Sequence, residues 1–159
     1  MTSRIRIPKE YERLINDPIE NVIFEINPSN IFEWNFVIFG PKDTPYEGGT
    51  YQGILSLPQE YPMHPPQVKF TTKIFHPNVY IDGKLCISIL HEGKDETGYE
   101  NELERWSPLN NIRTIFKSII SLLYDPNADS PANIDAGKLW REDKDAYNKR
   151  IKDEMKLNL

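Results

Sequence analysis

The sequence of 159 residues has one cysteine and no apolar run that approaches the length of a membrane-spanning helix. Cys86 alone cannot form an internal disulfide, and no signal peptide opens the chain, so we expect a reducing compartment, cytoplasmic or nuclear. A spanning helix needs roughly 20 consecutive apolar residues. Direct membrane insertion is therefore not expected, and any membrane recruitment needs a partner.

Basic residues are outnumbered. The chain has 19 Lys and Arg against 24 Asp and Glu, a formal net charge of −5, which argues against a general nucleic-acid-binding protein. The three histidines have no cysteine or histidine partner at ligand spacing, so no metal site is expected. Gly48-Gly49 precedes no lysine-bearing phosphate loop, so nucleotide binding is unsupported and no cofactor is expected.

The remaining pattern predicts a single domain over residues 1–159, of the α+β class, with strands first and helices afterwards. A short helix is expected at residues 4–16, with Pro8 in its first turn. Short connections between the strands favour an antiparallel meander. The four expected strands, each rich in β-branched or aromatic residues, are residues 21–26, 32–39, 50–57 and 67–70.

The second half is predicted to be helical. Ser107 has the character of an N-cap, with Pro108 at the first helical position. Apolar residues then recur at helical spacing up to the stop at Asp125-Pro126, so this helix must pack across the sheet. Two further helices are expected at about residues 132–140 and 144–157.

The only cysteine lies eight residues after the tripeptide His76-Pro77-Asn78. Asp82-Gly83 is a strong turn signal, so the chain should reverse and bring the Asn78 side chain back beside the thiol. A thiolate is a strong nucleophile, and an amide N–H can stabilise an oxyanion. The alternatives are a small buried side chain for Cys86 and a turn-bracing amide for Asn78.

This segment resembles the core of the ubiquitin-conjugating enzymes. Further motifs fall in the family's order, and the resemblance runs from about Pro8 to the end: Gly40-Pro41, Tyr46-Glu47-Gly48-Gly49, Tyr61-Pro62-Met63-His64-Pro65-Pro66, Trp106-Ser107-Pro108 and Asp125-Pro126-Asn127. The resemblance implies the family's fold and activity. Cys86 would accept ubiquitin as a thioester from the activating enzyme and pass it to a lysine of a substrate or of another ubiquitin, usually with a ligase.

The resemblance also implies roles for other residues. Asn78 would donate to the oxyanion or support its loop, and His76 is expected to be structural. Docking of a ligase, with the RING type expected, falls on residues of two loops: Met63, Pro62, Pro65, Ser107 and Pro108. The activating enzyme is expected to bind basic residues of the first helix: Arg4, Arg6, Lys9 and Arg13. The alternative is that these residues are only a solvated basic face. Trp106 is expected in the core.

The segment at about residues 91–105 is an acidic insertion. Six acidic and two basic residues give it a charge of −4, nearly all of the chain's −5. It resembles the loop-insert class, and the branch associated with degradation-type polyubiquitin chains and endoplasmic-reticulum quality control. Carboxylates can attract and orient a lysine, whereas desolvation must activate it. His91, Asp95 and Asp129 are the expected participants; the alternative is a solvated loop.

Three other functions stay open. A cysteine hydrolase using Cys86 with His76 would release ubiquitin to water, although no histidine–carboxylate relay is evident in the sequence. An inactive variant would only bind ubiquitin or ligases, and would not need Cys86. Conjugation of another ubiquitin-like modifier is the third.

Overall fold

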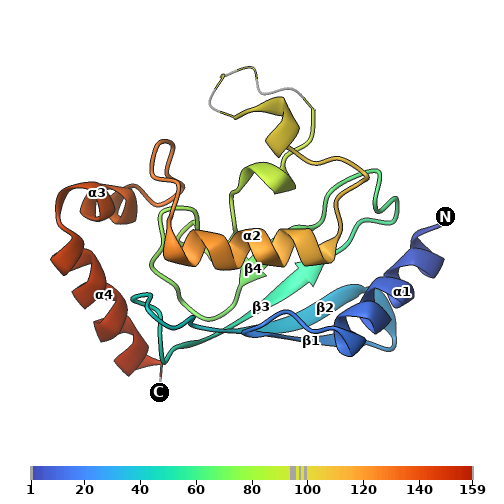
Figure 1. Cartoon of the computed structure of the whole chain (residues 1–159), viewed down its shortest axis with the longest axis horizontal. Coiled ribbons are helices and arrows are strands. Elements are labelled where there is room, and N and C mark those ends of the chain that lie inside the picture. The colour runs from blue at the N-terminus through green and yellow to red at the C-terminus, as the bar shows by residue number, and fades with distance from the viewer. Residues whose placement is uncertain (1, 94–95, 97, 99, 159) are drawn as a thin grey trace.

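The computed structural model describes residues 2–93, 96, 98 and 100–158. A four-stranded sheet carries a long helix across one face, with the remaining helices at its two ends (Figure 1). The elements in chain order are α1 (Ser3–Asn16), β1 (Val22–Asn27), β2 (Asn30–Phe39), β3 (Thr50–Ser56), β4 (Gln67–Phe70), η1 (Ser88–Leu90), η2 (Glu102–Glu104), α2 (Ile112–Tyr124), α3 (Ile134–Glu142) and α4 (Lys144–Leu157).

The sheet is the predicted antiparallel meander. Its strand order is β1-β2-β3-β4, with every neighbour antiparallel. Trp34 stands opposite Ile26 on one side and Leu55 on the other. Side chains alternate between buried and exposed along β2, β3 and β4, as expected for strands with only one covered face. The predicted strand bounds agree with the structure to within two residues.

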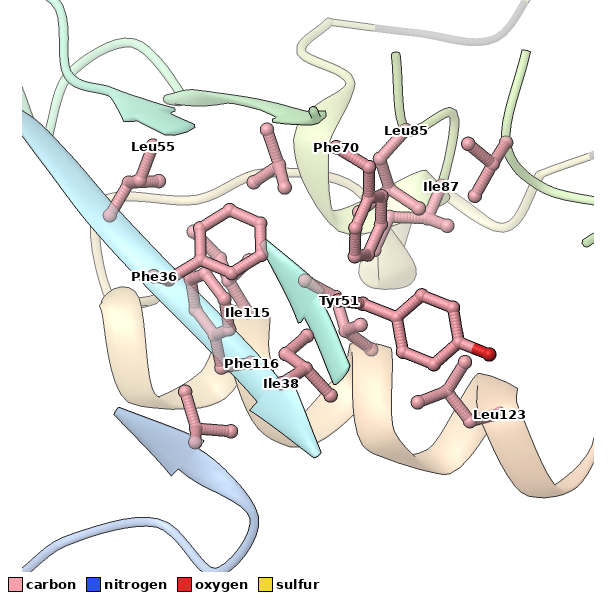
Figure 2. Packing of buried hydrophobic residues seen from close by; sticks show 14 of the residues in the cluster. Phe36, Ile38, Tyr51, Leu55, Phe70, Leu85, Ile87, Ile115, Phe116 and Leu123 are labelled. Atoms are coloured by element: carbon pink, nitrogen blue, oxygen red, sulfur yellow. The ribbon is translucent and has the colours of Figure 1, made fainter. Parts of the chain in front are cut away.

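Helix α2 covers that face. Its buried residues recur at helical spacing and meet the inward side chains of the strands (Figure 2). Phe116 packs edge-on against Phe24, with 4.7 Å between ring centroids, and against Phe36, at 5.0 Å. Edge-to-face aromatic pairs stabilise a core beyond their buried area. The core therefore fixes α2, and with it the loops at both of its ends.

The predicted start of α2 is wrong. The helix begins at Ile112, and Asn111 is its N-cap: the Asn111 side chain accepts from Thr114 N–H over 2.9 Å, and the Thr114 hydroxyl accepts from Asn111 N–H over 3.0 Å. Ser107 instead caps a turn, where its hydroxyl accepts from Leu109 N–H over 3.2 Å. This reciprocal capping box satisfies two backbone donors, the N–H groups of Asn111 and Thr114. The Ser107 hydroxyl bonds the N–H of Leu109 and so does not start the helix.

Pro8 also departs from the expectation. It is the sixth residue of α1 and not in its first turn, because the helix begins at Ser3 with Thr2 as the N-cap. A proline inside a helix removes one backbone hydrogen bond. The helix continues to Asn16 because Ile7, Glu10 and Leu14 are buried against the body of the protein.

Helices α3 and α4 close the chain at the end of the sheet opposite α1, and η1 and η2 lie beside α2, away from β1 and β2 (Figure 1). The predicted final helix matches α4, and α3 lies two residues later than predicted at both ends. Among the described residues, no helix is both long and apolar enough to cross a membrane.

Candidate active site

A tight reversal leads the chain to Cys86. Gly83 has a φ of +98°, in the left-handed region that glycine adopts without strain. The N–H of Gly83 donates to Tyr80 O, and the N–H of Cys86 donates to Asn78 O, both over 2.9 Å. The predicted reversal between Asn78 and Cys86 is confirmed, and it places these two residues side by side.

His76 is locked into the turn before Cys86. The side chain is 2% exposed. Its Nδ1 accepts from Asn78 N–H over 2.9 Å, and its Nε2 donates to Leu122 O over 2.8 Å. Burial lowers the pKa of His76 to about 4, because the charged ring would lose its hydration. Both ring nitrogens are occupied, so the Cys86–His76 pair that the alternative hydrolase requires is not formed.

Asn78 bridges the turn to the loop that follows α2. Its side-chain N–H donates to Asn127 O over 2.8 Å, and its side-chain oxygen accepts from Asn127 N–H over 3.1 Å. The geometry thus contains the loop support that the sequence predicted as one of two roles. An amide nitrogen carries two hydrogens, so one N–H remains beyond the bond to Asn127.

The Cys86 thiol is partly exposed and lies just before η1. Its sulfur is 3.6 Å from Nε2 of His91. Tyr80, which the sequence analysis did not single out, is linked to the thiol electrostatically. Its interaction with Cys86 is the main cause of the raised pKa of the Tyr80 hydroxyl. The sequence feature that could have indicated Tyr80 is its position in the reversal, two residues after Asn78.

His91 is held from its other side by a carboxylate. Its Nδ1 lies 2.8 Å and 2.9 Å from the two oxygens of Glu100, and Glu100 forms an ion pair with Arg105. The guanidinium of Arg105 also donates to Glu92 O over 2.8 Å and to Gly93 O over 2.9 Å. The sequence analysis found no histidine–carboxylate relay at Cys86; the structure forms one, between residues nine positions apart in an irregular loop.

A cavity of about 690 Å³ opens beside the thiol. Its walls come from the turn before Cys86, the insertion, α2 and the loop after α2. Exposed Asp129 and Ser130 line it, as do Asn78, His91 and Lys117. Asp129 therefore lines the same cavity as Cys86, and its part in orienting a lysine stays a prediction. Asp95, the other acidic residue predicted to act here, lies outside the described residues.

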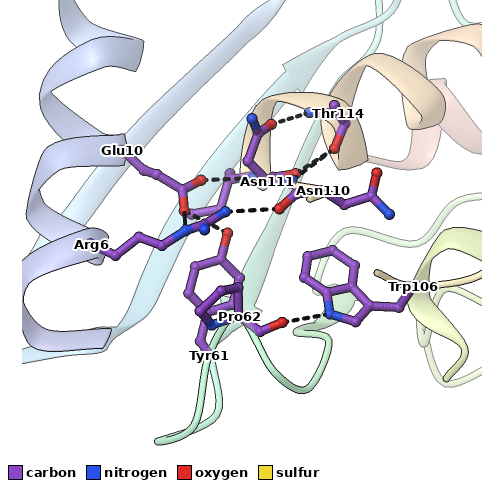
Figure 3. A network of polar contacts seen from close by, with 9 residues as sticks. Arg6, Glu10, Tyr61, Pro62, Trp106, Asn110, Asn111 and Thr114 are labelled. Carbon is purple, nitrogen blue, oxygen red and sulfur yellow. Dashed lines mark hydrogen bonds and ion pairs between the residues drawn. The ribbon is translucent and has the colours of Figure 1, made fainter. Parts of the chain in front are cut away.

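The residues predicted to dock a ligase lie on two touching loops, at residues 61–66 and 106–109. The indole N–H of Trp106 donates to Pro62 O over 2.8 Å (Figure 3). Met63 is 64% exposed, whereas Trp106 is 8% exposed, which confirms its predicted place in the core. Pro65 and Ser107 are partly exposed, and Pro108 is exposed.

A buried carboxylate joins these loops to α1. Glu10 is 6% exposed. It accepts from Tyr61 O–H over 2.6 Å, from Ile112 N–H over 2.9 Å and from Arg6 Nε over 2.8 Å. Figure 3 shows how it connects α1, the loop before Pro62 and the start of α2.

Arg6 corrects the prediction for the basic face. Its guanidinium also donates to Asn110 O over 2.9 Å and lies over the Tyr61 ring, so it is engaged within the fold. Arg4, Lys9 and Arg13 are exposed. These three residues form an external basic surface on α1, whereas Arg6 is partly exposed and paired within the fold.

The described residues contain no group of three or more His, Cys, Asp or Glu side chains arranged to hold a metal ion. What the site offers is a partly exposed thiol, a histidine paired with a carboxylate, and polar groups around an open cavity. Such an arrangement suits acyl transfer through a sulfur nucleophile.

Comparison with known proteins identifies the family. A family profile described as ubiquitin-conjugating enzyme matches residues 6–155. Ubiquitin-conjugating enzyme E2 G2 of Homo sapiens is 44% identical over 160 residues, which covers 99% of this chain and 97% of that protein. Ubiquitin-conjugating enzyme E2 13 of Arabidopsis thaliana is 48% identical over 147 residues, 91% of this chain and 89% of that protein.

A fungal relative agrees. Ubiquitin-conjugating enzyme E2 15 of Schizosaccharomyces pombe is 52% identical over 128 residues, 80% of this chain and 77% of that protein. These matches, the helix–meander–helix order and the thiol beside its cavity lead to one conclusion: the chain belongs to the ubiquitin-conjugating enzyme family and is a ubiquitin transferase.

Proposed function

We propose that Cys86 is the residue that carries ubiquitin. The observation that supports this is the partly exposed thiol at a cavity of about 690 Å³, the sole thiol of the chain. The sulfur attacks the thioester carbonyl of ubiquitin on the activating enzyme, and an amine later attacks the new thioester on Cys86. ATP is consumed by the activating enzyme, so the chain itself uses no cofactor.

The surroundings of Cys86 divide the remaining work. Asn78 braces the turn through Asn127, and its second N–H is available to the oxyanion that forms when an amine attacks. Asp129 in the cavity wall, and the carboxylates of the insertion, attract a protonated lysine toward the thioester. Carboxylates favour the charged amine, so removal of water from the amine must release its proton.

The acceptor we propose is a lysine of a second ubiquitin, which yields polyubiquitin chains of the degradation type. The acidic insertion supports this, because its described acidic residues Glu92, Glu96, Glu102 and Glu104 are exposed and follow the nucleophile closely. An exposed acidic surface can hold a basic patch of a protein acceptor as well as its lysine.

Partner surfaces follow from exposure. An apolar thioether flanked by prolines suits an adaptable contact, so Met63, with Pro62, Pro65, Ser107 and Pro108, forms our proposed docking surface for a RING-type ligase. Arg4, Lys9 and Arg13 form the proposed surface for the activating enzyme. We place the protein in the cytoplasm or nucleus, with recruitment to the endoplasmic reticulum through a partner.

Incubation with activating enzyme, ATP and ubiquitin tests the central proposal. The intact chain should form an adduct that a thiol reductant removes. Cys86→Ala should form none, and Cys86→Ser should form a reductant-resistant oxyester, because a hydroxyl replaces the thiol. Circular dichroism should be the same for all three proteins. A reductant-sensitive adduct on Cys86→Ala would refute the assignment.

The hydrolase alternative is favoured by one observation, the Cys86–His91–Glu100 array, with His91 in place of the predicted His76. It can be separated from transfer by a chase of preloaded enzyme with and without free lysine. Transfer predicts that lysine accelerates loss of the adduct and becomes ubiquitinated. A hydrolase would release free ubiquitin at the same rate in both cases.

A further inference from the structure

The imidazole of His91 is held in one orientation with one nitrogen at the thiol. A carboxylate only accepts hydrogen bonds, so the contact with Glu100 at 2.8 Å places a hydrogen on Nδ1. In the neutral ring this leaves the lone pair on Nε2, the nitrogen that is 3.6 Å from the Cys86 sulfur. The geometry thus points a proton acceptor at the nucleophile.

The array has a further support behind Glu100. Arg105 pairs with Glu100 and is itself anchored on the backbone oxygens of Glu92 and Gly93. The backbone of His91 is also fixed, because its carbonyl accepts from Trp106 N–H over 2.7 Å. Side chain and backbone are therefore restrained from separate directions, as expected of a group whose ring must hold one orientation.

Other ionisable groups surround the pair. Cys86 and Glu100 contact the His91 ring, and interaction with the thiol raises the pKa of the Tyr80 hydroxyl. Asp129, Glu104, Arg105 and Lys117 line the same cavity. His76 is turned away, with its nitrogens on Asn78 and Leu122. Among the described residues, His91 is the only histidine in contact with the thiol.

We propose that His91 shuttles the proton of Cys86 in both half-reactions, with Glu100 and Arg105 as positioning residues; this inference rests on the proposed thioester role of Cys86. During loading, the thiol proton passes to Nε2 as sulfur attacks the carbonyl carbon of ubiquitin on the activating enzyme. The new carbon–sulfur bond forms at Cys86. The old carbon–sulfur bond breaks, and the departing thiolate of the activating enzyme takes the proton from Nε2 through solvent.

During transfer the same proton path runs toward Cys86. A neutral lysine amine attacks the thioester carbonyl and forms a carbon–nitrogen bond. The nitrogen of the tetrahedral adduct then gives one proton to Nε2. The carbon–sulfur bond breaks, the electron pair leaves with sulfur, and Nε2 returns the proton to Cys86. The products are an isopeptide and a neutral thiol, so atoms and charges balance.

The test is single-turnover loading of Cys86 and discharge to free lysine between pH 6 and pH 9. It uses the full chain, His91→Gln and Glu100→Gln. Glu142→Gln is the matched control, since it removes the same charge from an exposed residue of α3 that does not line the cavity. His91→Gln should slow loading at pH 7 by about 10²-fold, the lower end for general acid–base catalysis. Glu100→Gln should give a smaller loss, and Glu142→Gln none.

The pH profile distinguishes a proton-shuttle role of His91 from a purely structural role. A free cysteine thiol has an ordinary pKa of about 8.5 and ionises without help above it. The loading defect of His91→Gln should therefore shrink as the pH rises to 9. In a His91→Ala variant, added imidazole should restore part of the rate at pH 7, because the cavity has room for it. A merely structural role predicts neither effect.

Two results of the loading assay would overturn the shuttle. One is an unchanged loading rate for His91→Gln at every pH. The other is a constant defect that neither pH nor imidazole alters, in variants whose melting temperatures match the intact chain. If the intact chain forms no adduct, the proposed function of Cys86 fails instead, so the two failures are distinguishable. Faster release of ubiquitin to water by intact enzyme than by His91→Gln, without any difference toward lysine, would assign the histidine to hydrolysis and refute the shuttle.

Discussion

The chain passes through a buried segment at residues 74–79 before it reaches Cys86, and after Cys86 it continues into partly exposed and exposed residues at 88–93. Before the cysteine, His76 and Asn78 are 2% and 4% exposed, and their polar atoms are bonded to backbone. After it, His91 keeps one nitrogen at the thiol and the other on Glu100. The comparison teaches that hydrogen-bond partners, more than distance along the chain, decide which histidine can move a proton.

The largest effect is expected from breaking the buried side. Asn78→Ala removes both side-chain bonds to Asn127 and the proposed oxyanion donor. Discharge to lysine should slow by about 10²–10³-fold, or roughly 3–4 kcal/mol, the usual scale for one such donor, while loading stays nearly normal. Single-turnover assays below the melting transition measure this. A slowing that only follows the unfolded fraction would leave Asn78 with loop support alone.

His76 should reveal its burial through pH. Its pKa of about 4 is lower than the usual 6.5, so between these pH values the unfolded chain binds a proton at His76 and the folded chain does not. The shift therefore costs no stability above about pH 6.5, and as the pH falls toward 4 it lowers the free energy of unfolding by roughly 3 kcal/mol. Urea unfolding at pH 7 and pH 4 should show that His76→Gln lacks this part of the loss.

The ring itself can be observed directly. Nuclear magnetic resonance of intact protein should find His76 neutral down to about pH 4. A His76 ring that titrates near its usual pKa of 6.5 in folded protein would contradict the burial argument and remove the contrast with His91.

The proposed ligase surface is joined to the segment after Cys86 by two contacts. The indole N–H of Trp106 donates to Pro62 O, and Nδ1 of His64 lies 2.7 Å from a carboxylate oxygen of Glu92. Met63→Ala should reduce stimulation by a RING ligase by about 1–2 kcal/mol, the scale of one apolar anchor. Discharge without ligase should not change. Met63→Leu is the matched control and should keep most of the stimulation. Equal stimulation of all three forms by several ligases would exclude Met63.

The smallest effect is expected from the charge of the insertion. Glu92→Gln with Glu96→Gln should slow transfer to a second ubiquitin by about 0.2–1 kcal/mol, the scale of exposed charge pairs. The effect should fade with salt, since the Debye length is about 8 Å at physiological ionic strength. Glu20→Gln with Glu142→Gln removes the same charge elsewhere and should have no effect. Identical chase rates for both double variants would show that the insertion is a solvated loop whose charge has no part in transfer.

Several features could be predicted from the sequence because they depend on neighbours in the chain. The meander follows from alternation and short connections, and the reversal before Cys86 follows from Asp82-Gly83. The start of α2 could not be predicted in this way. Ser107 and Asn111 are both good caps by residue type. The helix begins after Asn111, where Glu10, 102 positions from Ile112, accepts from the Ile112 N–H. The bonds of Arg6 to Glu10 and Asn110 O could not be predicted for a related reason, since Asn110 is 104 positions away in the chain.

The sequence by itself determined the sheet order, the family and the place of Cys86 in its reversal, because turn residues and period-two burial act over a few positions. Only the tertiary structure decided which side chains surround the thiol. His91 and Glu100 meet because Arg105 gathers backbone oxygens of an irregular loop, and Asn78 meets Asn127 because α2 packs on the sheet. Such contacts carry no periodic signal; they exist where packing brings distant segments within hydrogen-bonding distance.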